Sequence, residues 1–256
     1  MTILIANKVG HKFGGLSAVT DFNLNLHYGE LMGIIGPNGA GKTTVFNLIT
    51  GVYQASEGSM RFKGIEIVGK RPNQIAALRI GRTFQNIRLF RELSVLDNVR
   101  IAHYAQANYG ILEGLLHLGR YQKEEQRIIN NSRYLLSIFK LEQVAGELAK
   151  NLPYGLQRRL EIARALAISP ELLLLDEPAA GMNPHEIDQL MLLIQWIRQE
   201  FNLTILLIEH QMKLVMGICE RIQVLDFGET LAVGTPDMIQ NHSKVLEAYL
   251  GEVPGG

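Results

Sequence analysis

The chain has 256 residues, 47% of them hydrophobic, which is enough for a real core and excludes a disordered chain. Its 25 Lys and Arg residues equal its 25 Asp and Glu residues, so no global basic field favours nucleic acid or an anionic membrane. Cys219 is the single cysteine, and the first residues lack a signal-peptide pattern, so we expect a cytosolic protein.

The first sixty or so residues alternate between apolar and polar positions, as β-strands do. Gly14–Gly15 and Tyr28–Gly29 mark turns between the runs ILIANKV, AVTDFNLNLHY and GELMGIIG. A short helix is expected from Lys42 to Gly51, and the run MRFKGIEIVG then predicts a hairpin. These elements predict an N-terminal antiparallel β subdomain.

Within this region, the segment GPNGAGKTT follows an apolar strand and fits the phosphate-binding pattern G-x-x-x-x-G-K-[ST]. Its glycines let successive N–H groups converge on phosphates, Lys42 can bridge the β- and γ-phosphates, and the Thr43 hydroxyl can bind Mg²⁺. The alternative is a glycine-rich turn of purely structural kind. The residues predicted to bind a nucleotide here are Gly36, Asn38, Gly39, Gly41, Lys42, Thr43 and Thr44.

Residues 95–150 are mostly helical in pattern and contain no strand-like runs. The weakly charged stretch 101–119 carries polar and charged side chains and is a poor match to a membrane-spanning helix. We therefore expect a helical subdomain at about residues 86–165, inserted into a single α/β domain that covers residues 1–256.

The stretch NLPYGLQRRLEIARAL reads as a loop that leads into a helix, with Pro153 and Gly155 at the entrance. Backbone N–H groups at the start of a helix attract anions. Three arginines follow along the helix, and we interpret Arg158, Arg159 and Arg164 as solvated or paired side chains rather than as a phosphate-binding patch.

Next along the chain, LLLLDEP is a buried strand that ends in two carboxylates. Asp176 can hold Mg²⁺, directly or through water, and Glu177 can orient and deprotonate a water that attacks the γ-phosphate. Acids after strands are also common in turns, so the carboxylates alone leave both interpretations open. The phosphate loop in the same chain favours the catalytic one.

Apolar strands and helices then alternate, which predicts a buried, mainly parallel sheet with helices on its faces. The helix over 187–197 has a consistent apolar face, and Asn183, Pro184 and Glu186 supply its cap, first turn and capping box.

Three features of the sequence together resemble the ATP-binding cassette (ABC) ATPases. They are the phosphate loop, the strand that ends in Asp–Glu, and a Leu-x-x-Gly-x-Gln segment shortly before that strand. In that family the segment is the signature motif, which faces ATP held by the other subunit. The resemblance thus implies that Pro153, Tyr154 and Gly155 contact the nucleotide of a second cassette. It also implies the P-loop ABC-ATPase fold and an ATPase that uses ATP and Mg²⁺.

Three further residues match the family in their expected order. Gln85 in RTFQNIRLF is similar to the Gln-loop residue, which contacts Mg²⁺ and water and couples hydrolysis to membrane subunits. His210 in LLIEHQM is similar to the switch histidine, which contacts the γ-phosphate. Phe13 in HKFGGL matches the aromatic residue that stacks on adenine, although Phe is also an ordinary core residue.

The resemblance runs along nearly the whole chain and is strongest to the ATP-binding subunits of branched-chain and neutral amino acid importers. The stretches that carry it are HKFGG, GPNGAGKTTVFNLITG, RTFQNIRLFRELSVLDNV, QRRLEIARAL, DEPAAGMNP, LLIEHQMKLVMGI and EAYLGE. It implies a second cassette as a homo- or heterodimer partner, transmembrane permeases and, indirectly, a periplasmic solute-binding protein, with no nucleic acid. The subunit is expected to be peripheral, at the cytoplasmic face of the inner (plasma) membrane.

The chain departs from the family pattern in two motifs. The signature, often Leu-Ser-Gly-Gly-Gln, is Leu152-Pro153-Tyr154-Gly155-Leu156 here, and Pro153 lacks both a hydroxyl and an N–H for the γ-phosphate. Asn183 stands where many cassettes have Asp. We expect retained activity and modest ATP-driven dimerisation.

Alternative functions are import of another small solute such as urea, a non-transport ABC ATPase, a P-loop kinase and a module that binds ATP without turnover.

Overall fold

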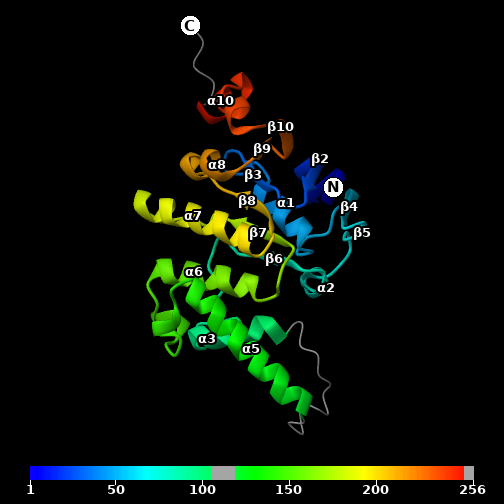
Figure 1. Ribbon diagram of the computed structural model, residues 1–256. Coiled ribbons are helices and arrows are strands. Elements are labelled where there is room, and N and C mark those ends of the chain that lie inside the picture. Colours follow the sequence, from blue (N-terminus) through cyan, green and yellow to red (C-terminus); the bar gives the residue numbers. More distant parts are fainter. Residues whose placement is uncertain (105–118, 251–256) are drawn as a thin grey trace. The chain divides into compact units, whose positions relative to one another are not determined.

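A computed structural model describes residues 1–104 and 119–250 (Figure 1). The chain forms two compact units, a core unit of Met1–Arg82 with Glu171–Gly256 and a helical unit of Thr83–Pro170. Most of the weakly charged stretch 101–119 and the last two residues of EAYLGE lie outside the described residues. Across the described ranges, none of the helices combines the length and apolar character that crossing a membrane requires.

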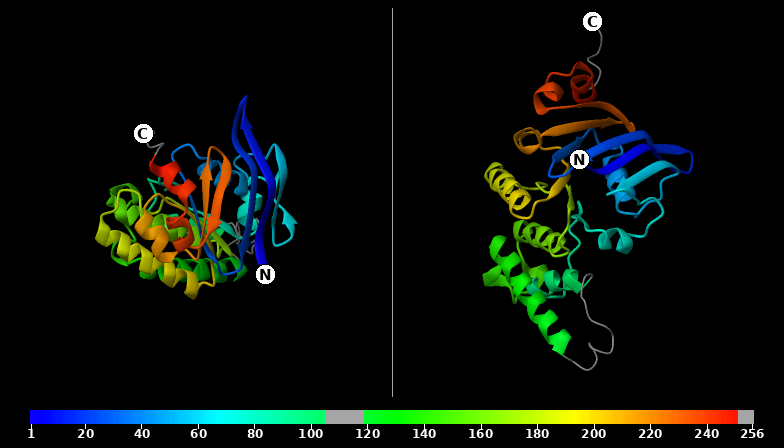
Figure 2. Two further views of the ribbon diagram at one scale, coloured as in Figure 1. Left: turned by 90° about the horizontal axis from the view of Figure 1, so that it is seen from above. Right: turned by 45° about the vertical axis from the view of Figure 1, so that its right-hand side comes forward.

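The core unit contains an antiparallel N-terminal sheet, as predicted, and its strand order is β2-β1-β4-β5. The run GELMGIIG is a strand as predicted, but it belongs to the other sheet of this unit. Its strands are β1 (Thr2–Phe13), β2 (Leu16–His27), β4 (Glu57–Phe62) and β5 (Ile65–Glu66). Figure 2 shows β1 and β2 as long neighbouring strands in blue, joined at Gly14–Gly15. The predicted hairpin is confirmed because β4 and β5 pair across their short turn.

A second sheet in the core unit has the order β10-β9-β3-β8-β7-β6, with every neighbouring pair parallel except β10 and β9. Three neighbouring strands of this sheet, Leu31–Ile35, Thr204–Ile208 and Leu172–Asp176, are buried at every residue, which explains their near-continuous apolar sequence. The strands are β3 (Leu31–Ile35), β6 (Ile80–Arg82), β7 (Leu172–Asp176), β8 (Thr204–Ile208), β9 (Arg221–Asp226) and β10 (Glu229–Gly234).

The main core lies between the two sheets and around α1 (Lys42–Ile49). Phe22 from the antiparallel sheet, Phe46 from α1 and Leu174 from the parallel sheet all belong to this buried cluster. The remaining helices of the core unit are α2 (Pro72–Ala77), α7 (Pro184–Glu200), α8 (Met212–Ile218), α9 (Pro236–Gln240) and α10 (Ser243–Leu250). The mainly parallel α/β core therefore forms as predicted.

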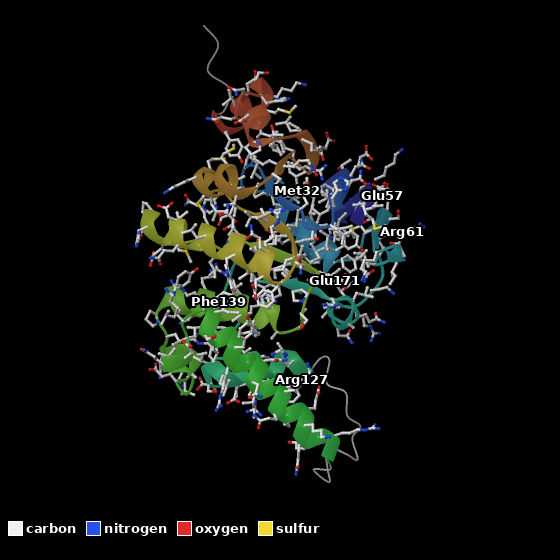
Figure 3. The ribbon with its side chains drawn as sticks, viewed as in Figure 1. Met32, Glu57, Arg61, Arg127, Phe139 and Glu171 are labelled. Atoms are coloured by element: carbon white, nitrogen blue, oxygen red, sulfur yellow. The ribbon has the colours of Figure 1, made fainter. Side chains whose placement is uncertain are left out.

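In the described part of the helical unit, three α-helices and two short 3₁₀ helices occur. They are α3 (Val95–His103), α5 (Gly119–Ile138), η2 (Glu142–Val144), η3 (Ala149–Asn151) and α6 (Tyr154–Leu166). In Figure 3, Arg127 lies within α5, paired with Glu124, and Phe139 lies just past its C-terminal end, where it is buried. The helical pattern of residues 95–150 is thus confirmed where the structure describes it.

The start of α7 has the capping box that the sequence predicts. The Asn183 side chain accepts a hydrogen bond from the Glu186 N–H at 3.0 Å, and Glu186 accepts one from the Asn183 N–H at 2.8 Å. The amide at the position where many cassettes have Asp is therefore a helix cap here.

We expect Asn183→Ala to lower the free energy of unfolding by about 1 kcal/mol, because the Glu186 N–H in the first turn loses the side-chain oxygen that accepts its hydrogen bond. Urea unfolding followed by circular dichroism measures the change. Gln195→Ala, at an exposed position inside the same helix, is the matched control and should stay within about 0.5 kcal/mol of the wild type. Equal stability of the two variants would contradict the capping role.

Candidate active site

The candidate site lies at one edge of the parallel sheet in the core unit. The strands β3, β8, β7 and β6 are parallel neighbours, so their carboxyl ends meet at the same edge. There β3 leads into the phosphate loop, β8 leads to His210, and β7 and β6 end at Asp176 and Arg82. The topology thus brings together motifs that are more than a hundred residues apart in the chain.

The phosphate loop has a backbone that glycine alone fits without strain. Gly36 has φ 150°, and a Cβ there would lie 2.0 Å from the Leu225 carbonyl oxygen. Gly41 has φ 96°, and a Cβ there would lie 2.6 Å from the Ala18 carbonyl oxygen. Helix α1 begins directly after Gly41, and no side chain caps it. Its first N–H groups are therefore available to an anion.

Lys42 is buried against this loop. Its ammonium group donates hydrogen bonds to the carbonyl oxygens of Gly36, at 2.7 Å, and Pro37, at 2.8 Å. Burial lowers the pKa of Lys42, and the carboxylates of Glu177 and Asp176 oppose that shift. The Lys42 ammonium group therefore interacts electrostatically with both predicted acidic residues.

Asp176 is 1% exposed and forms a buried ion pair with Arg82, whose guanidinium donates to it at 2.9 Å. The same guanidinium donates to Asn47 and Thr50 of the α1 segment, at 2.8 and 2.9 Å. Arg82 therefore connects β6, β7 and α1 behind the site. The sequence analysis missed this residue, because an arginine at the end of a short strand gives no local signal of its partner.

Glu177 and His210 lie next to each other. The Glu177 N–H donates to the Ile208 carbonyl oxygen at 2.9 Å, which ties the residue after β7 to the end of β8. A carboxylate oxygen of Glu177 lies 3.8 Å from His210 Nδ1. Glu177 has a left-handed backbone with φ 46°, a conformation that is strained for a residue other than glycine.

Phe13 ends β1 and is 45% exposed, so it is not an ordinary core residue. Its ring packs edge-on against His11, with centroids 4.6 Å apart, and against Tyr53, with centroids 5.2 Å apart. His11 stacks on Tyr53 and bonds through Nδ1 to the Gln54 carbonyl oxygen at 2.8 Å. Phe13 is thus a partly exposed ring beside two other aromatic side chains, and its contact with an adenine base stays a prediction.

The helical unit holds the other predicted site residues, Gln85 and the start of α6 at Pro153, Tyr154 and Gly155. Pro153 is the N-cap residue of α6, without a side-chain cap, as the loop-to-helix pattern predicts. The contacts of Gln85, Pro153, Tyr154 and Gly155 with a nucleotide stay predictions.

Within the helical unit, α6 and the segment around Gln85 are joined by a buried ion pair, which the sequence analysis also missed. Arg158 and Glu161 are each 1% exposed and pair at 3.0 Å. Arg158 donates to the carbonyl oxygens of Phe84 and Gln85, and Glu161 accepts from the N–H groups of Phe84 and Arg88. Burial raises the pKa of Glu161, while the charge of Arg158 and these N–H groups lower it in opposition to burial.

For Arg158, the interpretation of the α6 arginines as solvated or paired side chains is confirmed, because Arg158 forms an ion pair with Glu161. The pair is buried, which the amphipathic pattern of the helix does not predict. Arg164 lies over the Phe90 ring, with its guanidinium carbon 5.6 Å from the ring centroid. Periodicity places residues on a helix face, but it does not show which loops cover that face.

The donor groups of the core unit fit a nucleotide and a hard cation. The glycine backbone, the uncapped start of α1 and Lys42 suit phosphate oxygens, while the Thr43 hydroxyl and the Asp176 carboxylate are oxygen ligands of the kind that Mg²⁺ prefers. Thr43 is exposed in the first turn of α1. The site can therefore bind a triphosphate and place a carboxylate beside it.

Comparisons with known proteins identify relatives of this chain. Residues 19–180 match the family model described as "ABC transporter", and residues 229–254 match the one described as "Branched-chain amino acid ATP-binding cassette transporter". The high-affinity branched-chain amino acid transport ATP-binding protein LivG of Escherichia coli K12 is 46% identical over 250 residues, which are 98% of each chain.

Solved structures resemble the fold along nearly its whole length. The ADP conformation of MJ1267, an ATP-binding cassette of an ABC transporter, has a TM-score of 0.84 and 29% identity, over 98% of this chain and 100% of that one. A dimeric post-hydrolysis state of the cassette MJ0796, bound to ADP and Pi, has a TM-score of 0.78 and 25% identity, over 91% and 99%.

Proposed function

The chain belongs to the ABC transporter family, and from that premise we propose that it is the ATP-hydrolysing subunit of an importer for branched-chain and neutral amino acids. One observation carries the chemistry: the ends of three strands, β3, β7 and β8, bring Lys42, Asp176, Glu177 and His210 to one sheet edge. The likeness to LivG, whose name includes branched-chain amino acid transport, supports the solute class.

ATP binding uses the phosphate loop and the ring of Phe13. The glycine backbone and α1 donate N–H groups to the phosphates, and Lys42 adds a positive charge. Phe13 stacks on the adenine ring. Thr43 and Asp176 would hold Mg²⁺, with Gln85 as a further ligand on the family resemblance, and the ion would supply positive charge beside the phosphates.

Hydrolysis requires a water in line with the γ-phosphate. Glu177 orients that water and takes its proton, and His210 supports the γ-phosphate from the adjacent strand end. Lys42 stabilises the charge that develops on the phosphoryl oxygens. The products are ADP and inorganic phosphate.

Transport requires other chains. The start of α6, at Pro153, Tyr154 and Gly155, contacts the ATP of a second cassette, and dimer closure is passed to the permeases. Because Pro153 has no N–H, this contact is weaker than with serine at that position. The dimeric structure of MJ0796 supports pairing of cassettes. A periplasmic binding protein would deliver the solute, with this subunit at the cytoplasmic face of the membrane.

Residues 86–165 act in this proposal as the helical subdomain of a single cassette of residues 1–256. Parts of 86–100, after Gln85, contact the permeases. Phe90, with 49% of its surface exposed, offers an apolar anchor there.

The experiment that tests the proposal is uptake of labelled solutes by cells whose only copy of the protein carries Lys42→Ala. The panel contains branched-chain, neutral, acidic and basic amino acids and urea. Selective loss of branched-chain and neutral amino acid uptake is expected, because without the Lys42 charge at the phosphates the ATP hydrolysis that drives this import stops.

Lys244→Ala, which removes an exposed charge on α10, is the matched control and should leave uptake unchanged. Loss of urea uptake alone would show that the subunit drives import of urea rather than of amino acids. Unchanged uptake across the panel, together with copurifying ribosomes or DNA, would favour a non-transport ABC ATPase.

A further inference from the structure

We infer that Glu209, which has no part in the chemistry above, is a positioning residue that holds Glu177 and His210 in register with each other. The inference rests on the proposed function of these two residues. It concerns the core unit alone, where all the contacts below occur.

Glu209 is a fully buried carboxylate directly after β8, with 0% of its surface exposed. One of its oxygens, Oε1, accepts a hydrogen bond from the Ala179 N–H at 2.7 Å. The other, Oε2, accepts from the N–H groups of His210, at 3.0 Å, and Gln211, at 3.2 Å. One side chain thus binds the loop after Glu177 with one oxygen and the loop that carries His210 with the other.

These bonds complete an attachment of Glu177 on both sides. On the N-terminal side of Glu177, its own N–H donates a hydrogen bond to the Ile208 carbonyl oxygen at 2.9 Å. On the C-terminal side, the Ala179 N–H donates to Glu209, and the Ala180 N–H donates to the Glu177 carbonyl oxygen at 3.2 Å. The strained backbone around Glu177 is therefore attached to two consecutive residues at the end of β8, Ile208 and Glu209.

His210 lies between the two carboxylates. Its Nδ1 is 3.8 Å from Glu177 and 4.0 Å from Glu209, both too long for a hydrogen bond. The separation of base and histidine is therefore set by the backbone of their loops, which Glu209 holds. A misplacement of about 1 Å at a reacting group can lower a rate about a hundredfold.

Only a carboxylate satisfies these three donors. A carboxylate has two acceptor oxygens, whereas the amide of Gln has one oxygen and an NH₂ group that would face an N–H donor. Burial favours the neutral acid and raises the pKa of Glu209, while the N–H groups of Ala179, Gln211 and His210 oppose that shift by binding the charged form. Glu209→Gln is therefore an isosteric change that releases one of the two loops.

The experiment compares ATP hydrolysis by Glu209→Gln and wild-type protein. We expect kcat to fall about ten- to a hundredfold with the KM for ATP within about twofold, because Glu209 makes no hydrogen bond to the phosphate loop or to Phe13. Glu30→Gln is the matched control. Glu30 is also buried, accepts the His27 N–H at 2.8 Å and pairs with Arg221, but it precedes β3, at the end opposite the phosphate loop. Its kcat should equal that of the wild type.

A double-mutant cycle with His210→Ala separates positioning from general damage. If Glu209 acts through His210 and Glu177, its substitution should lower kcat much less in the His210→Ala background than in the wild type. If the fall in kcat of the double variant equalled the product of the falls in the two single variants, the inference would be overturned. A KM for ATP that rises as kcat falls in Glu209→Gln would overturn it as well.

Amide hydrogen exchange of Ala179, His210 and Gln211 tests the attachment without any hydrolysis. Because the Gln amide keeps one acceptor oxygen, we expect faster exchange in Glu209→Gln than in wild-type protein at the amides of one loop, either Ala179 or the pair His210 and Gln211, with other core amides unchanged. Unchanged protection would overturn the inference whatever the activity. If the wild-type protein hydrolysed no ATP, the proposed function would fail, while the exchange data would still decide the role of Glu209.

Discussion

Glu177→Gln protein is expected to bind ATP and to lose hydrolysis, with kcat lower by about 10²- to 10⁴-fold. Gln has the shape of Glu and the same left-handed backbone requirement, so the loop between β7 and α7 keeps its conformation. The amide cannot take a proton from water at neutral pH. The loss therefore falls on the chemical step rather than on binding of the nucleotide.

Phosphate release measures the rate, and titration with a fluorescent ATP analogue measures binding. Glu247→Gln, an exposed carboxylate on α10, is the matched control and should hydrolyse ATP as the wild type does. Wild-type turnover by Glu177→Gln would show that another group accepts the proton. Loss of nucleotide binding would instead show that Glu177 shapes the binding site.

Arg82→Met is expected to lower the free energy of unfolding by about 3–5 kcal/mol. The side chains of Arg82 and Asp176 are 5% and 1% exposed, so removal of the guanidinium leaves a carboxylate inside the protein without its ion-pair partner. The hydrogen bonds to Asn47 and Thr50 are lost with it. A substitution at the site's rear is thus expected to unfold the core unit readily.

Urea unfolding in nucleotide-free buffer measures this loss. Arg61→Met is the matched control, because Arg61 pairs with Glu66 at 3.6 Å on the surface, where such pairs contribute about 0–1 kcal/mol. Adding Asp176→Asn to Arg82→Met should restore part of the stability, since the buried group is then neutral. If Arg82→Met were as stable as Arg61→Met, the buried pair would have no net stabilising role.

The parts of the site that the sequence predicted are those with local signals. The phosphate loop is a contiguous pattern, Asp176 and Glu177 stand at the end of the apolar strand β7, and His210 comes two residues after the apolar strand β8. Because parallel strands end at one edge, a correct assignment of the strands was enough to bring Lys42 and these acids together.

The missed residues are those whose partners depend on tertiary register. Arg82 meets Asp176 because β6 pairs with β7, with Arg82 opposite Leu174. Arg158 is buried because the segment around Gln85 covers that side of α6. Neither neighbour can be read from the helical or strand periodicity of a single segment.

Glu209 had a usable signal that the sequence analysis did not apply. It follows an apolar strand directly, as Asp176 ends one, and it precedes a predicted catalytic residue. A charged residue at that position is either solvated or engaged by backbone donors. Adding this question to the interpretation of LLIEH would have singled out Glu209 beside His210.

The left-handed backbone of Glu177 bears on which residue evolution can keep at this position. A side chain with a Cβ in that conformation costs about 1–2 kcal/mol, which glycine avoids. Glycine at position 177 would therefore relieve local backbone strain but would remove the carboxylate that the proposed mechanism requires. The proposed catalytic base thus stands at a position where the backbone itself disfavours any side chain.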